Sequence, residues 1–291
     1  MTVGYLGPQS SFTHQAAQIL FGKTQLHAFP SIPNCLQAVS EGTCDCGVVP
    51  IENSLEGSVH ATIDYLFHRS NLQVIEEVIL PIKQQLLVSP MTQLTEITTI
   101  MSHPQALAQS QTYLEQHFPK VKLEAVSSTT AAAEYVRDHP EKGYAAIAST
   151  QAAARYQLTI AATDIQDNAV NQTRFWVVKK APQEGLKSAA QTEASANIAK
   201  QTLLVTLPSN QPGALHQILA AFGWRKIGLS KIESRPLKTH LGEYFFVIDL
   251  VCEQSSRLIA NALEEITLLG ATVRNLGAYP VTTMMDSSRE K

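Results

Sequence analysis

The stretch from residue 47 to residue 64 constrains the fold of this chain more than any other. Its apolar residues 47–51 end in the polar sequence Glu-Asn-Ser at 52–54. Beyond residue 58, apolar side chains return with helical spacing at Val59, Ile63 and Leu66. This pattern predicts a strand, a polar turn and a helix. Such a junction is a common ligand site in α/β proteins, and a helix N-terminus favours anions. We therefore expect an α/β fold with an anion-binding site here.

The composition is typical of a globular protein with more than one hydrophobic core. The chain has 291 residues, of which 44% are hydrophobic and 16% charged. A chain of this length usually divides into domains. The net charge of −3 gives no electrostatic reason to expect nucleic acid or an anionic membrane as a partner. No apolar run approaches the roughly 20 residues of a membrane helix, and the first residues do not resemble a signal peptide.

The cysteines do not have the spacing of a metal or redox site. Cys44 and Cys46 are two residues apart, Cys35 precedes them, and Cys252 is remote in sequence. Zinc and dithiol sites usually have two residues between their cysteines, and no histidine follows at ligand spacing. We expect reduced thiols in a cytoplasmic protein, with no metal bound.

Strand-like and helix-like segments alternate through the first 180 residues. Apolar runs predict strands at 2–6, 26–29, 47–51, 100–102, 122–126, 144–148 and 174–179. Helical spacing and serine caps predict helices at about 11–21, 32–40, 58–68, 104–117, 131–137 and 149–156. A capping box of Ser102 and Gln105 marks the start of helix 104–117. The alternation predicts parallel sheets, with the long apolar stretch 74–89 passing between two lobes.

The character of the sequence changes after residue 180. Residues 181–200 are mostly Ala, Ser, Gln, Glu and Lys, which is typical of a linker. Beyond it the sequence predicts strand 202–207, helix 214–222, strands 227–237 and 243–252, helix 256–269 and strand 271–281. This βαββαβ order is ferredoxin-like. The polar tail from residue 282 is expected to be frayed.

Six short motifs occur in an order and spacing that resemble one family. They are 4–8 (Gly-Tyr-Leu-Gly-Pro) with 11–17, 49–59 around Glu-Asn-Ser, Ser102-His103-Pro104-Gln105 with Gln109, Asn171-x-Thr173-Arg174-Phe175, Gly213-Ala214-Leu215, and 232–236 (Ile-Glu-Ser-Arg-Pro). Over essentially its whole length the chain resembles the prephenate dehydratases of the two-domain form, which carry a C-terminal ACT regulatory domain.

The resemblance implies a particular domain organisation. Residues 1–180 would form a catalytic domain of two α/β lobes, similar to periplasmic ligand-binding proteins, with a cleft between the lobes. The lobes would be about 1–78 with 167–180, and 79–166. Residues 201–281 would form the ferredoxin-like ACT domain after the linker 181–200, and 282–291 a tail.

The resemblance also implies a reaction that needs no cofactor. Prephenate is a dianion on a non-aromatic ring, and it becomes phenylpyruvate by losing CO₂ and its hydroxyl group, a step in phenylalanine biosynthesis. Aromatisation drives the reaction, so neither a redox cofactor nor a metal is expected. Two alternatives remain open: dehydration of arogenate, in which an amino group replaces the keto group, and a sensor of amino acids without catalysis.

Four residues are the candidates for catalysis. The family motif places Thr173 at the departing hydroxyl group and makes Asn53 a hydrogen-bond donor to the substrate. Arg174 either grips a carboxylate or forms a salt bridge, because consecutive strand residues point to opposite faces. Glu52 beside a dianion would be repulsive, so it is expected to orient Asn53 or Thr173, or to be protonated.

Further residues of the same motifs are candidates for contact with the substrate. They are Ser11, Phe12, Ser54, Gly57, Ser58, Val59, Ser102, Gln109 and Phe175. His14 and His103 also lie in motifs, where each has the chemistry of a general acid or could hold a turn.

The second domain is expected to bind an effector. Phenylalanine-binding ACT domains pair side by side, which implies a homodimer or homotetramer with feedback regulation by phenylalanine. Carried over to this sequence, the effector residues are Gly213, Ala214, Leu215, Gly228, Leu229, Glu233, Ser234 and Arg235. Gly228 stands where the family commonly has asparagine, so tyrosine or another amino acid remains an alternative effector. Deletion beyond Ala181 is expected to leave an active catalytic domain that phenylalanine does not inhibit.

Overall fold

A computed structural model describes residues 1–22, 24–69, 71–182, 198–208, 212–240 and 242–284. Most of the predicted linker 181–200 therefore lies outside the described residues. The contacts divide the chain into two compact units. Unit 1 comprises Met1–Ile63, Val78–Phe175 and the chain from Thr283, and unit 2 comprises Asp64–Glu77 and Trp176–Thr282. Each unit is described by itself below.

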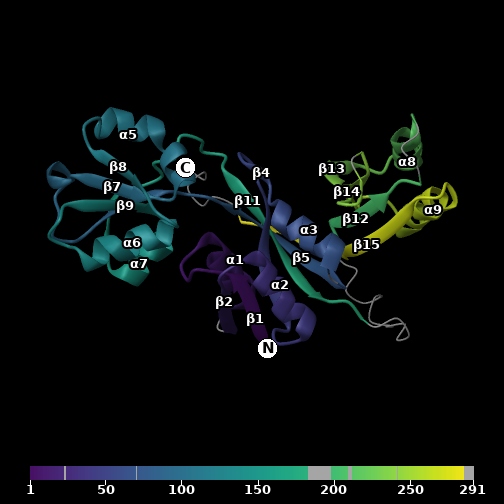
Figure 1. The fold of residues 1–291 in the computed structure, drawn as a ribbon, viewed down its shortest axis with the longest axis horizontal. Helices are drawn as coiled ribbons and strands as arrows, with labels where there is room; N and C mark the ends of the chain where they lie inside the picture. The colour runs from purple at the N-terminus through teal and green to yellow at the C-terminus, as the bar shows by residue number, and fades with distance from the viewer. Residues whose placement is uncertain (23, 70, 183–197, 209–211, 241, 285–291) are drawn as a thin grey trace. The chain divides into compact units, whose positions relative to one another are not determined.

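The first sheet of the chain begins with parallel strands. β1 (Thr2–Leu6) pairs in parallel with β2 (Gln25–Phe29) and with β3 (Cys46–Asn53). Helices α1 (Phe12–Phe21) and α2 (Ile32–Glu41) connect these strands, and Ser11 and Ser31 cap the two helices. The hydrogen-bonded order continues from β3 to β11 (Gln172–Lys180), β5 (Leu72–Pro81) and β16 (Val281–Thr283). Figure 1 labels α1, α2, β1, β2, β5 and β11 of this group.

A second sheet completes unit 1. Its order is β10-β6-β9-β7-β8, and its strands are β6 (Gln85–Val88), β7 (Thr99–Ser102), β8 (Lys122–Ala125), β9 (Tyr144–Ala148) and β10 (Thr159–Ala162). Its helices are α4 (Pro104–Ala108), α5 (Gln111–His117), α6 (Thr129–Asp138) and α7 (Thr150–Tyr156), with a 3₁₀ turn at Leu94–Glu96. β7 is parallel to β8 and β9, but β6 is antiparallel to β9 and β10. The sheet is thus mixed rather than parallel, and β10 was not predicted.

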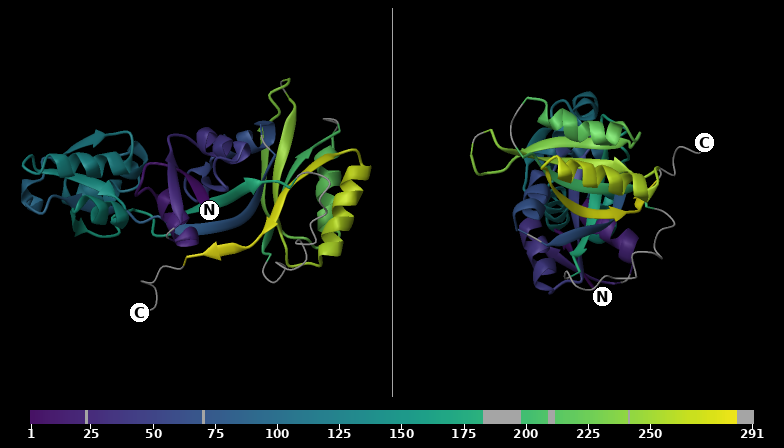
Figure 2. Two further views of the ribbon diagram at one scale, coloured as in Figure 1. Left: turned by 90° about the horizontal axis from the view of Figure 1, so that it is seen from below. Right: turned by 90° about the vertical axis from the view of Figure 1, so that its right-hand side faces the viewer.

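The ferredoxin-like βαββαβ order is confirmed in unit 2. β12 (Lys200–Thr206), α8 (Ala214–Gly223), β13 (Leu229–Pro236), β14 (Tyr244–Val251), α9 (Ser256–Leu268) and β15 (Thr272–Tyr279) follow one another. The strands form an antiparallel sheet in the order β13-β14-β12-β15. Both helices lie on one face of it (Figure 2), over a core that includes Leu203, Phe222, Ile248 and Ile266.

Unit 2 also takes in segments from the first half of the chain. Helix α3 (His60–Arg69) brings Phe67, whose ring stacks on Phe245 with centroids 3.7 Å apart. The fully buried Glu77 on β5 accepts hydrogen bonds from the Trp176 indole at 3.0 Å and from Lys200 Nζ at 2.8 Å. A buried carboxylate needs such partners, so these segments are part of the core of unit 2.

The junction at 47–64 differs from the prediction. β3 continues to Asn53, and residues Gly57–Ser58 form a short strand, β4, that pairs back with Glu52 and Asn53. The predicted helix start at residue 58 was wrong, because α3 begins at His60. The Val59 N–H donates to the Ile51 carbonyl at 2.8 Å. This amide is therefore engaged in the hairpin and is not available to an anion.

Two other predictions needed correction. The predicted helix 104–117 is divided into α4 and α5, and its N-cap is His103 instead of Ser102. The prediction of a frayed tail is wrong for Thr282 and Thr283, which lie in β16 next to β5. Residues 285–291 lie outside the described chain. None of the helices in the described ranges is both long and apolar enough for a membrane span.

Candidate active site

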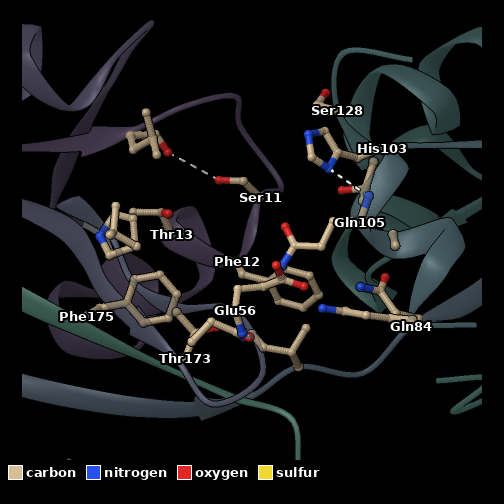
Figure 3. A pocket seen from close by; sticks show the side chains of 18 of the residues that line it. Ser11, Phe12, Thr13, Glu56, Gln84, His103, Gln105, Ser128, Thr173 and Phe175 are labelled. Atoms are coloured by element: carbon tan, nitrogen blue, oxygen red, sulfur yellow. Dashed lines mark hydrogen bonds between the residues drawn. The ribbon is translucent and has the colours of Figure 1, made fainter. Parts of the chain in front are cut away.

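Unit 1 contains a cavity of about 410 Å³ that receives residues from both of its sheets. One part of the lining comes from the loop after β1, the start of α1, the β3–β4 hairpin and β11. The other part comes from the residues just before β6, from α4 and from the start of α6. Figure 3 shows the side chains that point into it. The lining residues used below are Ser11, Phe12, Asn53, Glu56, Gln84, His103, Gln105, Gln109, Ser128, Thr173 and Phe175.

The predicted pair Asn53 and Thr173 meets in this cavity. The Asn53 side-chain amide donates from Nδ2 to Thr173 Oγ1 at 2.9 Å. The other end of the same amide, Oδ1, accepts from the backbone N–H groups of Leu55 and Glu56 at 2.9 and 3.1 Å. The hairpin turn therefore fixes which way the amide faces. Because Thr173 Oγ1 accepts from Asn53, its own hydroxyl proton points to a different acceptor.

A chain of side-chain amides extends this pair across the cavity wall. Asn53 Nδ2 also donates to Asn171 Oδ1 at 2.8 Å, and Asn171 Nδ2 donates to Gln109 Oε1 at 3.0 Å. With its oxygen engaged, Gln109 presents its own NH₂ group as the donor for a ligand. Asn171 is almost fully buried. It was noticed in the sequence as part of a motif, but not as a residue that organises the site.

Glu52 and Arg174 lie on the opposite face of the same two strands. They form an ion pair with 2.6 Å between Arg174 Nη1 and Glu52 Oε2. Neither residue lines the cavity, whereas their neighbours Asn53 and Thr173 do. This placement follows from the two-residue period of a strand. Of the two roles considered for Arg174, the structure shows the salt bridge, and Glu52 is its partner.

The predicted substrate contacts separate into two groups. Ser54 and Ser102 do not line the cavity: the Ser54 hydroxyl accepts the Gln172 N–H at 2.9 Å, and the fully buried Ser102 donates to the Ile147 carbonyl at 2.6 Å. These two serines hold backbone segments in place. The cavity does bring together the other predicted contacts: Ser11, Phe12, Gly57, Ser58, Val59, Gln109 and Phe175.

The two motif histidines have different surroundings. His14 is buried and does not line the cavity; its Nδ1 accepts the Ser10 N–H at 3.1 Å. Burial, together with the positive charge of Arg155, lowers the pKa of His14. The imidazole ring of His14 is therefore neutral, and it holds the turn at Ser10 through this hydrogen bond. His103 does line the cavity, and its Nδ1 accepts the Gln105 N–H at 3.3 Å.

Several lining residues were missed in the sequence. Glu56, Gln84, Gln105 and Ser128 line the cavity although none was a site candidate. Ser128 was recognised only as a helix cap, which it is. Its position between a strand and the helix that follows is typical of a ligand contact. A single sequence does not show, however, which strand–helix junctions of the two sheets line the same cavity.

The predicted effector residues all lie in unit 2. Gly213, in the left-handed conformation with φ of 88°, is the N-cap of α8, so Ala214 and Leu215 form its first turn. Gly228 precedes β13, which begins at Leu229 and contains Ser234. On β13, Glu233 pairs with Lys231 at 3.2 Å. Arg235 pairs with Asp64 of α3 at 3.0 Å, and Lys238 also contacts this carboxylate at 2.7 Å. Arg235 therefore joins β13 to α3.

Comparisons with known proteins agree with this architecture. Residues 3–183 match the family model of prephenate dehydratase, and residues 201–267 match that of the ACT domain. Within the described residues, no group of three or more His, Cys, Asp or Glu side chains is placed to hold a metal ion.

Named relatives are similar along nearly the whole chain. A prephenate dehydratase of Lactococcus lactis subsp. lactis is 46% identical over 287 residues, covering 98% of this chain and 99% of the relative. One of Bacillus subtilis is 46% identical and covers 96% of this chain and 98% of the relative. The crystal structure of an Arthrobacter aurescens prephenate dehydratase in complex with L-Phe superimposes with a TM-score of 0.83 at 34% identity, covering 96% of this chain and 90% of that one. The chain belongs to the prephenate dehydratase family.

Proposed function

We propose that the cavity of unit 1 is the place where prephenate loses its hydroxyl group and its ring carboxylate to become phenylpyruvate. The observation that carries this proposal is the 2.9 Å hydrogen bond from Asn53 to Thr173 at the cavity wall. It turns the Thr173 proton away from Asn53 and toward an acceptor such as the leaving hydroxyl group. A donor on Oγ1 also polarises the O–H bond, since hydrogen bonds in a chain strengthen one another.

The bond changes set the demands on the site. The C–O bond breaks and the hydroxyl group leaves as water, taking up one proton that comes from the solvent, directly or relayed through Thr173. The bond from the ring to its carboxylate breaks, CO₂ leaves, and the electron pair completes the aromatic ring. Thr173 stabilises the departing oxygen by donating a hydrogen bond, and one well-placed donor of this kind is worth about 10²–10³ in rate.

The other lining residues suit the rest of the substrate. Phe12 and Phe175 contribute apolar surface for the ring, while Gln109 and Gln84 carry neutral donors for oxygen atoms. Fixed dipoles inside a cavity stabilise developing charge more strongly than water does. Orientation of the substrate by these groups supplies a further part of the rate.

The competing substrate is arogenate, and one lining residue favours it. Glu56 is the acidic residue among those that line the cavity, and a carboxylate suits the ammonium group of arogenate better than the keto group of prephenate. Comparing kcat/KM for the two substrates decides between them. Turnover of neither substrate would leave the alternative of an amino-acid sensor.

Substitution of Thr173 tests the proposed role directly. Thr173→Ala should lower kcat about a hundredfold or more with a smaller effect on KM, because it removes a bond made in the transition state. Thr173→Ser keeps the hydroxyl group and is the matched control, for which we expect most of the activity. Phenylpyruvate formation followed by absorbance is the measurement, and a wild-type rate for the alanine variant would remove Thr173 from the mechanism.

Regulation and assembly are part of the same proposal. We propose a catalytic domain at 1–180, a linker at 181–200 and an ACT domain at 201–281 that binds phenylalanine and pairs with that of a second copy, in a homodimer or homotetramer in the cytoplasm. Support comes from the Arthrobacter relative, which was solved with L-Phe, and from the exposed left-handed Gly213 turn before α8. Light scattering with and without phenylalanine, alongside inhibition of turnover, tests both parts.

A further inference from the structure

The charges around the cavity do not match those of the proposed substrate. Prephenate carries two carboxylates, yet no lysine or arginine occurs among the described residues that line the cavity, where Glu56 is the acidic side chain. Neutral donors must therefore hold the anionic groups. One neutral donor of the lining, His103, has no assigned role in the reaction.

Its hydrogen bond at the start of α4 determines which nitrogen of His103 carries the proton. His103 is the N-cap of α4, and its Nδ1 accepts the backbone N–H of Gln105. An imidazole nitrogen that accepts a hydrogen bond is unprotonated, so the proton of the neutral ring lies on Nε2. Figure 3 shows the ring between Gln105 and Ser128, with its second nitrogen turned away from Gln105.

The cavity wall next to His103 favours an anion. Ser128, the N-cap of the ten-residue helix α6, and Thr129 line the same cavity. The N-terminus of a helix carries a partial positive charge. A carboxylate placed here receives a directed N–H bond from His103 in a favourable local field.

We propose that His103 binds a carboxylate of the substrate through its Nε2–H group. This inference rests on the proposed function, because it assigns a partner to one of the two carboxylates of prephenate. The cap contact through Nδ1 then has a second consequence besides starting α4: it keeps the proton on Nε2, the nitrogen that the cap does not use.

Two substitutions separate the two nitrogens of His103. In His103→Asn the shorter amide reaches the position of Nδ1, so it keeps the cap but has no group at the position of Nε2. In His103→Gln the longer amide reaches the position of Nε2 with an NH₂ donor but loses the cap. We expect the asparagine variant to raise KM for prephenate about 10–100-fold, the loss of one hydrogen bond to a charged group, with kcat changed only a few-fold and Tm unchanged.

The glutamine variant should show the reverse pattern. We expect its KM within about threefold of the wild type and its Tm lower by about 2–4 °C, the usual effect of losing a helix cap. If the asparagine variant has the wild-type KM, or if only the glutamine variant raises KM, His103 acts solely as a cap and the inference is overturned.

A binding measurement separates this test from the proposed function. Phenylpyruvate retains one carboxylate, and calorimetric titration measures its affinity without turnover. Weaker binding to His103→Asn than to the wild type and to His103→Gln supports the carboxylate contact even if prephenate is not the natural substrate. Equal binding to all three proteins, together with an unchanged KM, contradicts it.

Discussion

Single side-chain amides determine the direction of hydrogen bonds at this site. The Asn53 amide cannot reverse without losing the two backbone donors on its oxygen and placing two acceptors, the oxygens of Asn171 and Gln172, against that oxygen. The orientation is therefore held by five contacts instead of one. Thr173 receives its hydrogen bond as a result of the hairpin geometry, and its proton is directed by residues that do not react.

Asn53 should consequently matter almost as much as Thr173. We expect Asn53→Ala to lower kcat by at least about tenfold, and the double variant Asn53→Ala/Thr173→Ala to be hardly slower than Thr173→Ala alone, because residues that act as a unit are not additive. Asn34→Ala on α2, outside the cavity, is the control. Fully additive losses in kcat would show that the two residues act independently.

His14 gives the stability of the protein a dependence on pH. Its pKa is lowered in the folded state, first by burial and then by Arg155, so below the ordinary value of about 6.5 the unfolded chain binds a proton that the folded protein does not. Stability should then fall as the pH drops through that value. Asn in place of His14 still accepts the Ser10 N–H bond but does not titrate.

Urea unfolding at pH 7.5 and at pH 5.5 measures this effect. We expect the wild type to lose more free energy of unfolding between these two values than His14→Asn. The pKa of His68 is lowered too, mainly by burial, so part of the dependence should remain in the variant. An identical loss in both proteins would mean that His14 does not titrate differently in the folded state.

At the scale of elements, the β3–β4 hairpin shows what the sequence can and cannot tell. Polar residues at the end of an apolar run predicted the strand, the turn and the presence of ligand contacts, and the turn does line the cavity. The two-residue strand β4 exists only through its pairing with β3. Local patterns carry no signal for it, so Ser58 was assigned to the following helix.

The start of α4 illustrates the same limit. Ser102 and Gln105 fit a capping box, but the Ser102 hydroxyl is taken by the Ile147 carbonyl of the neighbouring strand β9. His103 caps the helix in its place. A contact between distant segments thus overrides a correct local pattern. The alternation of Thr173 and Arg174, by contrast, follows from strand geometry alone and was predictable.

Helix α3 is the element most suited to report effector binding. It follows the hairpin that lines the cavity, and its Asp64 is paired with Arg235 and Lys238, next to the predicted effector motif. Burial alone would raise the pKa of Asp64, but the hydrogen bonds from Lys238 and Arg235 bring it below its usual value. The carboxylate is therefore charged, and the link is ionic, throughout the neutral range.

Removing this charge should weaken regulation before it affects catalysis. We expect Asp64→Asn to raise the phenylalanine concentration for half-inhibition about 3–10-fold, a coupling change within the usual allosteric range, with kcat/KM in the absence of phenylalanine close to the wild type. Glu264→Gln on the exposed side of α9 is the control. An unchanged inhibition curve for Asp64→Asn would exclude this link.

At the scale of the whole molecule, the two compact units do not have the same boundaries as the domains predicted from the sequence. Family resemblance predicted both domains and the position of the linker region. It did not predict that segments 64–77 and 176–180 belong to the same compact unit as the ACT strands. β5 and β11 also belong to the first sheet, where β11 lies next to β3. The local sequence pattern carries no signal that Glu77, Trp176 and Phe67 contact residues of the ACT strands.

This organisation gives a reason to expect that residues 1–181, cut from the rest of the chain, do not form a stable and active protein by themselves. Truncation there removes Lys200 from Glu77, Tyr279 from Trp176 and Phe245 from Phe67. Removing one partner of a buried ion pair typically costs about 3–5 kcal/mol, and the exposed aromatic surface adds to this loss. We expect the truncated protein to be aggregated or to melt well below the full chain, with little turnover.

Circular dichroism melting and prephenate turnover of residues 1–181 test this expectation. Lys200→Met in the full chain isolates the electrostatic part: it should lower Tm by itself, and Glu77→Gln added to it should recover part of the loss, since the buried charge is then removed as well. A truncated protein with the Tm and turnover of the full chain would contradict this expectation. Segments 64–77 and 176–180 would then be stable without the ACT strands, and the catalytic domain would fold by itself.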